Sequence, residues 1–337
     1  MTDNASLLLK LINEGKTIKE ISEEMNLSHK KIWTMLSLIK NKGFEFDRIF
    51  HYNGDIIYNP KKTFIETPSN SVDLITSHSD NEIEVLVISD LHIGSIIERP
   101  DLLSDLYEYC AKEGINIIII AGDLIDGTFG KFDKIYDNVS DQIDYLLKVF
   151  PFDKSILNLV TLGDHDLSAL KDCGQNIIRV LENYRHDIVP LGYGLGKINI
   201  KDDFIWVRHR GIEEIKMEPL TNCLLLDGHS HGTLSYNSHP NNYTRIQLSP
   251  FCDFSEFPTA VRMKLEFKNG KIFFGSFEQL FFGAKTLTVS KFEIPLGYGK
   301  DINPKVPIKL ESDRAKKKVL TQNVISQIDK FNSKWML

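Results

Sequence analysis

The stretch IEVLVISDLHIG at residues 83–94 decides the fold. Its first part, IEVLVIS, is an almost continuous apolar run, which is typical of a strand buried on both faces of a sheet. The run leads directly into Asp90 and His92, and Gly94 just after them permits the chain to turn so that both side chains can reach one ion. We therefore expect a central strand that ends in two metal-binding side chains.

Four further apolar runs end in the same kinds of residue. They are INIIIIAGD, ILNLVTLGDHD, FIWVRH and CLLLDGHSH, which end at Asp123, Asp164–Asp166, His209 and His229–His231. Because ligands lie outside the carboxyl ends of the strands in an open α/β sheet, these side chains should meet at one edge. A single strand-end aspartate is often an ordinary cap, but five strand ends of this kind indicate a functional site.

The order of the elements predicts an α/β domain. Helical segments near 101–113, 140–150 and 174–186 alternate with the apolar runs. A hairpin that turns at Asn269-Gly270 makes the sheet antiparallel near its end.

The mixture of side chains at the strand ends indicates transition metals. Carboxylate oxygens and imidazole nitrogens together suit Mn, Fe, Zn, Ni or Co. Two such cations about 3.5–4 Å apart need a carboxylate between them, which screens their repulsion.

Other polar residues near these runs are expected to have structural rather than catalytic roles. Neighbouring residues in a strand point to opposite faces, so the side chains of Arg208 and Arg210 should lie on the face opposite to His209. A structural role for the two arginines is therefore favoured over binding of a phosphate. Asp126 is expected to shape a tight turn, and Asp166 to orient the histidine before it or to cap a helix. The remaining histidines match no ligand spacing and are placed on the surface or in loops: His29, His51, His78, His186 and His239.

Taken in order, the blocks SDLHIG, AGDLIDG, LGDHD, VRHRG and DGHSH resemble the calcineurin-like metallophosphoesterase superfamily, over about residues 83–285. The resemblance implies a β-sandwich flanked by helices and metal-dependent hydrolysis of phosphomonoesters or phosphodiesters. It also implies two divalent metals, with Mn as the first expectation, and a metal-bound hydroxide as the nucleophile.

The resemblance assigns a role to each block. The first metal would be held by Asp90, His92 and His231, and the second by Asp164, His209 and His229, with Asp123 bridging the two. His165 would lie near the leaving-group oxygen as general acid or electrostatic stabiliser, so that Asp123 and His165 form the catalytic pair.

Asp164 departs from the pattern, because the family usually has asparagine at this position. A carboxylate can still bind a metal, but it adds negative charge where a phosphate must bind. The departure bears on substrate affinity and metal preference, and it leaves an inactive site as an alternative.

The sequence of residues 1–60 predicts a small separate domain. Three helices between 5 and 42 precede a hairpin around Asn53-Gly54, and this order resembles the winged helix-turn-helix family. Its third helix carries Lys30, Lys31 and Lys40 without opposing acids, which suits contacts to nucleic-acid phosphates. Glutamates in the preceding helix disfavour this, so a module for dimerisation or for covering the active site is the alternative.

The remaining segments and the composition complete the prediction. We expect a linker at 61–82 with at most one short strand, the phosphoesterase domain at 83–300 and a lysine-rich helical tail at 301–337. The formal charge of −6 excludes a basic surface over the whole molecule. No apolar run reaches the length of a membrane helix, no signal-peptide pattern is present and the four cysteines are scattered, so a reduced, cytoplasmic setting is expected. The oligomeric state is not predicted.

These features favour a metal-dependent phosphodiesterase, with a nuclease that is bound to nucleic acid through its N-terminal domain as the first hypothesis. VISDLHIGS and AGDLIDGTFG also resemble the small subunit of archaeal family D DNA polymerase, and GDLIDG resembles the nuclease subunit of double-strand-break repair complexes. Two alternatives stay open. One is a phosphatase or phosphodiesterase acting on a nucleotide or a phosphoprotein, and the other is a DNA-binding regulator whose phosphoesterase domain is inactive.

Overall fold

The computed structural model describes residues 3–40, 46–60, 71–76, 81–130, 132–210, 223–239, 243–254, 258–283 and 287–296. The chain divides into two units, Met1–Tyr298 and Gly299–Leu337. The predicted helical tail at 301–337 and His78 lie outside the described residues. No helix among the described residues has the length and apolar character needed to cross a membrane.

A seven-stranded sheet forms one layer of the first unit, in the order β15-β14-β13-β4-β5-β6-β7. Strands β4 to β7 run parallel, and β13 to β15 pair antiparallel. Every residue of β5 and β6 is buried, as their continuous apolar sequences predict. The strands are β4 (Glu82–Ile88), β5 (Ile117–Ala121), β6 (Leu157–Leu162), β7 (Ile188–Tyr193), β13 (Thr259–Lys268), β14 (Lys271–Phe281) and β15 (Leu287–Pro295).

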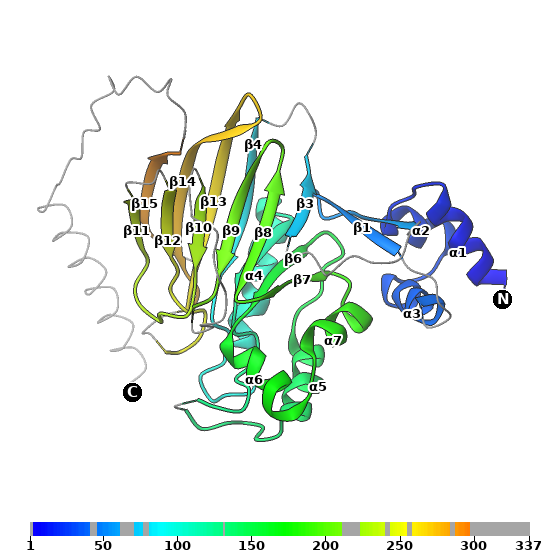
Figure 1. The fold of residues 1–337 in the computed structure, drawn as a ribbon, viewed down its shortest axis with the longest axis horizontal. Coiled ribbons are helices and arrows are strands. Elements are labelled where there is room, and N and C mark those ends of the chain that lie inside the picture. The colour runs from blue at the N-terminus through cyan, green and yellow to red at the C-terminus, as the bar shows by residue number, and fades with distance from the viewer. Residues whose placement is uncertain are drawn as a thin grey trace, which may run out of the picture. The chain divides into compact units, whose positions relative to one another are not determined.

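An eight-stranded sheet forms the second layer, in the order β11-β12-β10-β9-β8-β3-β1-β2 (Figure 1). Its inward side chains, such as Ile198, Ile205 and Val207, share one core with Val85 and Val87 of β4, which makes the predicted sandwich. The strands are β1 (Phe46–His51), β2 (Ile56–Pro60), β3 (Ser71–Ile75), β8 (Leu195–Ile200), β9 (Asp203–Arg208), β10 (Leu224–Asp227), β11 (Ser235–His239) and β12 (Tyr243–Gln247).

Four helices pack on the other face of the seven-stranded sheet. A second core joins Leu86 and Ile88 of β4 to apolar side chains of these helices, such as Leu106 and Leu146. The helices are α4 (Pro100–Glu113), α5 (Val139–Val149), α6 (Asp164–Cys173) and α7 (Ile177–Tyr184). Helix α6 is not among the predicted helical segments, although a capping role was one of the two expected for Asp166. The α/β class and the flanking helices are confirmed.

The N-terminal segment has the predicted order of three helices and a hairpin. The helices are α1 (Asp3–Asn13), α2 (Ile18–Met25) and α3 (His29–Lys40). Thr17 and Glu20 form a capping box at the start of α2. Strands β1 and β2 pair around Asn53-Gly54. The assignment of this segment to the winged-helix family stays a prediction.

The hairpin is part of the eight-stranded sheet. Strand β1 pairs in parallel with β3, and β3 continues the sheet through β8. Strand β3 lies inside the predicted linker, so that segment contributes a structural strand. The ring of Trp33 in α3 stacks on His186 at 5.1 Å, and the Tyr58 hydroxyl is hydrogen-bonded to Nδ1 of the same imidazole. His186 lies in the turn between α7 and β7, as one of the two predicted placements has it, but it is buried, so the surface placement was wrong.

Candidate metal centre

The five strand ends meet at one edge of the sandwich. Among the described residues, three groups of side chains place their ligand atoms within 4.8 Å of one another, and two of these groups share Asp123. The first group is Asp90, His92, Asp123 and His231, and the second is Asp123, Asp164, His209 and His229. The structure therefore brings all seven predicted ligands together in the predicted division.

The backbone at these positions is unusual. Five of the seven candidate ligands have positive φ angles, between 45° and 75°: Asp90, His92, Asp123, His229 and His231. Residues other than glycine rarely adopt this conformation, and where they do they cluster at functional sites. Hydrogen bonds between the loops hold it, since Asp90 N donates to Gly122 O at 3.0 Å and His92 N donates to Asp123 O at 3.0 Å.

The polar atoms of the centre lie close together. Nε2 of His209 is 3.0 Å from Oδ2 of Asp123 and 3.1 Å from Oδ1 of Asp164. Nε2 of His231 is 3.1 Å from Oδ1 of Asp90. These contacts pair each imidazole with a carboxylate, which is the donor set that divalent transition metals prefer.

Two further observations fit a cation between these groups. Oδ2 of Asp123 is buried and, although Nε2 of His209 lies 3.0 Å away, makes no hydrogen bond of adequate geometry among the described residues. Buried carboxylate oxygens are nearly always satisfied. Nε2 of His92 lies 3.1 Å from Nε2 of His231, so two imidazole nitrogens face each other. The residues present therefore fit bound metal ions.

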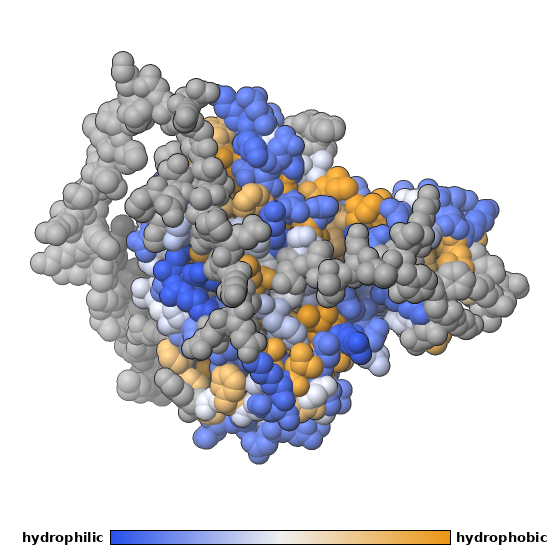
Figure 2. Space-filling model, viewed as in Figure 1, coloured by the Kyte–Doolittle hydropathy of each residue, from blue (hydrophilic) through white to orange (hydrophobic). Residues whose placement is uncertain are grey.

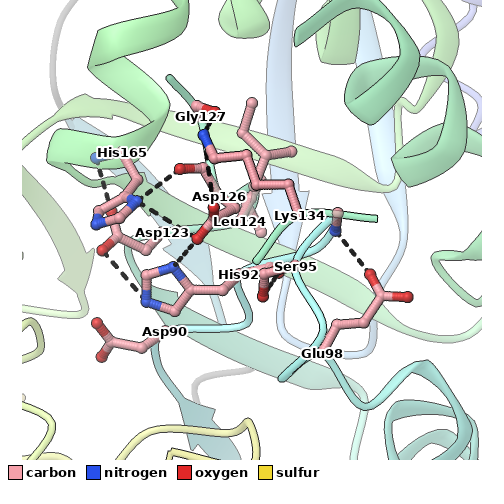
Figure 3. Close-up of polar contacts among 12 residues, drawn as sticks. Asp90, His92, Ser95, Glu98, Asp123, Leu124, Asp126, Gly127, Lys134 and His165 are labelled. Atoms are coloured by element: carbon pink, nitrogen blue, oxygen red, sulfur yellow. Dashed lines mark hydrogen bonds and ion pairs between the residues drawn. The ribbon is translucent and has the colours of Figure 1, made fainter. Parts of the chain in front are cut away.

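The outer nitrogen of His209 has a partner that sets the tautomer of the ring. Nδ1 of His209 lies 2.6 Å from the carbonyl oxygen of Ala121, to which it donates. This leaves the Nε2 lone pair for a metal. Nδ1 of His92 lies 3.3 Å from Oδ1 of Asp126, and Nδ1 of His165 donates to the Asp126 carbonyl oxygen at 2.6 Å (Figure 3).

Asp126 therefore does more than shape a turn, which was its predicted role. It is buried, and its carboxylate faces two histidines and the ammonium of Lys134, 3.7 Å away. The sequence signal was the spacing G-D-x-x-D, in which the second aspartate follows the candidate bridging residue by three positions.

Glycines give the side chains room. A Cβ on Gly122 would lie 2.0 Å from Nδ1 of His209, and a Cβ on Gly163 would lie 2.0 Å from Oδ1 of Asp123. Gly122 also has a φ of 94°, which strains any other residue. The glycine before each aspartate in the GD blocks is thus required by the site.

The electrostatics favour positive charge inside the centre. Burial opposes ionisation of Asp90, but the hydrogen bond from His231 and the charges of the surrounding histidines outweigh it and lower the pKa of Asp90. Burial likewise opposes protonation of His209, yet Asp123 and Asp164 outweigh it and raise the pKa of His209 well above its ordinary value. Cations that replace these protons would meet ionised carboxylates.

Asp166 joins two of the loops. Its carboxylate accepts hydrogen bonds from the backbone N–H groups of Leu124, Ile125 and Gly163, at 3.1, 3.0 and 2.8 Å. It lies in the first turn of α6, which agrees with the predicted helix-capping role rather than with orienting His165. Burial, followed by the charge of Asp123, raises the pKa of Asp166 to about 7.

Arg208 and Arg210 have the predicted structural role. Both guanidinium groups bind the buried carboxylate of Asp227, which Arg245 also contacts. Asp227 lies two residues before His229, so the arginines tie the end of β9 to the end of β10. The face in Figure 2 shows a strongly hydrophilic patch over this end of the eight-stranded sheet.

The predicted nucleic-acid contacts lie elsewhere, on α3, where Lys30 and Lys31 are exposed and Lys40 is half-buried.

The chain was compared with known proteins. A search of curated proteins found no significant match. Among the solved structures similar to this chain are the following three. The phosphoesterase Yfce from E. coli is 13% identical, with 56% of this chain and 96% of that chain covered and a TM-score of 0.36. Vps29 of Chaetomium thermophilum is 12% identical, with 63% and 96% covered and a TM-score of 0.35. The nuclease MPE of Pseudomonas putida is 15% identical, with 70% and 96% covered and a TM-score of 0.33.

A model of the calcineurin-like phosphoesterase family matches residues 83–256. This match spans just over half of the 337-residue chain and includes all seven candidate ligands. The residue types, the shared aspartate and the family match agree with one another. The chain therefore belongs to the calcineurin-like phosphoesterase family and is a metal-dependent hydrolase that acts on phosphate esters.

Proposed function

We propose that this protein is a phosphodiesterase with a dinuclear metal centre and that its substrate is nucleic acid. The observation that carries the proposal is the shared position of Asp123, whose carboxylate belongs to both groups of candidate ligands. A carboxylate in this position can hold two cations and screen their mutual repulsion. Asp90, His92 and His231 would complete one metal site, and Asp164, His209 and His229 the other.

The bound metals would supply Lewis-acid polarisation of a phosphoryl oxygen and a lowered pKa for a water molecule. The chain itself would position the ester and manage the leaving group. His165 suits the second task, because its Nδ1 donates to the Asp126 carbonyl and its Nε2 stays available for proton transfer. The backbone N–H of His165 also donates to Oδ1 of Asp123 at 3.1 Å, which places the ring beside the centre.

Manganese is the metal we propose first. The donors are carboxylate oxygens and imidazole nitrogens without thiolates, a set that suits Mn as well as Fe, Zn, Ni and Co. The candidate ligands include three aspartates, Asp90, Asp123 and Asp164, whose hard oxygen donors favour Mn among these metals.

The nucleic-acid substrate is supported by charge and access. Lys30 and Lys31 are exposed on α3 and would attract phosphate groups. The side chains of His229 and His231 at the centre are 37% and 20% exposed, so the site is open to a large substrate. We propose that α3 binds the nucleic acid while the metal centre cleaves it.

The test is cleavage of end-labelled single-stranded and double-stranded DNA in Mn²⁺. The Asp123→Asn protein is the inactive variant, and Asp144→Asn, an exposed aspartate on α5, is the matched control. Cleavage by the wild type and by Asp144→Asn, lost in Asp123→Asn, is the expected result.

Two outcomes would redirect the proposal. Hydrolysis of bis(p-nitrophenyl) phosphate without cleavage of DNA or RNA would reject the nucleic-acid substrate and point to nucleotides or phosphoproteins. Metal binding without hydrolysis of any ester would reject catalysis and favour a regulator with an inactive domain.

A further inference from the structure

Two aromatic side chains lie exposed beside the candidate metal centre. Phe129 is 47% exposed and Phe254 is 40% exposed, although large apolar side chains usually lie in the core. Phe129 belongs to the segment that follows β5, and Phe254 to the segment that follows β12. Exposed apolar side chains beside a polar site mark a ligand-binding surface.

Both rings pack directly on histidines of the centre. The ring centroid of Phe129 lies 4.5 Å from that of His165, at an interplanar angle of 47°. The ring centroid of Phe254 lies 4.4 Å from that of His231, at 66°. Phe132 supports Phe254 from the side, with the two rings perpendicular at 5.5 Å. Each exposed ring therefore has one side on an imidazole of the centre and another side open to solvent.

The backbone that carries Phe129 is anchored to the centre. Thr128 N donates to Oγ of Ser168 at 2.9 Å, and Nζ of Lys134 donates to Gly127 O at 2.6 Å (Figure 3). Ile135 N donates to Gly94 O at 2.7 Å. These bonds tie the start of the segment to α6 and its end to the loop after β4, which holds Asp90 and His92.

The segment before Phe254 is anchored in the same way. Asp253 N donates to Ile97 O at 2.8 Å, and the guanidinium of Arg99 binds the Asp253 carboxylate at 2.9 Å. The two aromatic rings are thus held in place by the structure around them. Pre-positioned rings lose little conformational entropy when a ligand binds.

The chemistry of the rings indicates what they contact. A phosphate ester bound at the centre places its substituent within reach of His165 and His231, and therefore against the two rings. A neutral aromatic ring offers nothing to a phosphate, but it stacks well on another flat ring. Stacking of a nucleobase on an aromatic side chain strengthens binding by about tenfold or more and depends little on the identity of the base.

We propose that Phe129 and Phe254 form a nucleobase-binding rim, so that the preferred substrate is a nucleic-acid strand with an unpaired base next to the scissile phosphate. The base must be unpaired because, in a duplex, both faces of each base are covered by its neighbours. This inference rests on the proposed function and adds the class of nucleic acid to it.

The experiment compares two single strands of the same length, one with all its bases and one with abasic sites on both sides of a single labelled phosphate. The quantity measured is the ratio of kcat/KM for the first strand to that for the second. We expect a ratio of about 10 or more in the wild type. We expect it to fall toward 1 in Phe129→Ala combined with Phe254→Ala, and to recover with Phe129→Trp combined with Phe254→Trp.

Tyr184→Ala is the matched control, because Tyr184 is a 64% exposed aromatic residue on α7, outside both groups of candidate ligands. It should keep the wild-type ratio. Titration with Mn²⁺ alone checks that the alanine variants still bind metal. A wild-type ratio near 1, or a ratio that the phenylalanine variants leave unchanged, would overturn the inference while the nuclease proposal stood. Hydrolysis of bis(p-nitrophenyl) phosphate with neither strand cleaved would reject the nuclease proposal, and this inference with it.

Discussion

Oδ1 of Asp126 lies 3.3 Å from Nδ1 of His92, while Nε2 of the same ring faces Nε2 of His231 at 3.1 Å. The carboxylate thus contacts the side of the imidazole that is turned away from the candidate metal. Asp126 is buried, and its negative charge makes the ring a better electron-pair donor.

Replacement of Asp126 by asparagine should weaken metal binding by about 10- to 100-fold, because the His92 ring loses its charged partner. Isothermal titration with Mn²⁺ measures the affinity. Asp144→Asn should bind Mn²⁺ as the wild type does. An unchanged affinity for Mn²⁺ in the Asp126 variant would mean that Asp126 only shapes the turn, as the sequence predicted.

Asp164→Asn restores the asparagine that the family usually has at this position. The variant removes a negative charge close to where a phosphate would bind, so inorganic phosphate should inhibit it about tenfold more strongly, which corresponds to about 1.4 kcal/mol of repulsion removed. Metal affinity should fall, since a neutral amide replaces an anionic ligand. Inhibition constants at constant saturation with Mn²⁺ separate the two effects. Equal inhibition of both proteins would show that the charge of Asp164 is fully neutralised by the metals.

His186 should make the stability of the protein depend on pH. Burial, with the charges of Arg48 and Lys40, lowers the pKa of His186 well below its ordinary value. An unfolded histidine titrates near about 6.5, so below this pH the unfolded state takes up a proton that the folded state does not. The free energy of unfolding therefore does not depend on the protonation of His186 above about pH 6.5. As the pH falls from there toward the pKa of His186 in the folded state, the free energy of unfolding decreases by about 1.4 kcal/mol per pH unit.

Urea denaturation at a series of pH values measures this slope. His186→Gln should give a shallower slope below about pH 6.5, whatever its stability at neutral pH. His29→Gln should change the slope less, because His29 is only half-buried and its pKa is lowered by a smaller desolvation. A slope that His186→Gln leaves unchanged would mean that the Trp33 contact tolerates a charged imidazole.

The lysines of α3 should contribute salt-dependent affinity if this helix contacts phosphates. Lys30→Ala combined with Lys31→Ala should weaken binding to every sequence and reduce the slope of log affinity against log salt by about 1 to 2. Lys112→Ala combined with Lys148→Ala removes the same charge from exposed positions on α4 and α5 and serves as the control. Identical slopes in the two double variants would remove α3 as the binding helix and favour the alternative role in dimerisation or in covering the active site.

The sequence predicted the parts of the molecule that leave a local pattern. The strands before Asp90, Asp123 and Asp164 were recognised because continuous apolar runs end in metal-binding side chains. Strands β7 and β8 were missed, because Pro190 and three nearby glycines resemble a loop. In the structure β7 is the last strand of its sheet, and an edge strand tolerates proline since its N–H need not pair.

Residues without a local pattern were not predicted. A single histidine such as His186 has no spacing signal, and its partners Trp33 and Tyr58 are more than a hundred positions away in the chain. Phe129 and Phe254 follow no helical or strand periodicity, because each lies in an irregular segment. Their proximity to the centre depends on how the loops fold over one another, which only the tertiary structure shows.

The pairing of β1 with β3 has a consequence for any nucleic acid that α3 binds. The hairpin shares a sheet with β9 and β10, which precede His209 and His229. Arg48 binds Glu182 of α7, and Trp33 stacks on His186 just beyond this helix, so the helices and the hairpin are held against this region. The distance between α3 and the metal centre would be constant, so the protein would cut nucleic acid at a fixed distance from the place where α3 binds it. Cleavage would then release fragments of one characteristic length.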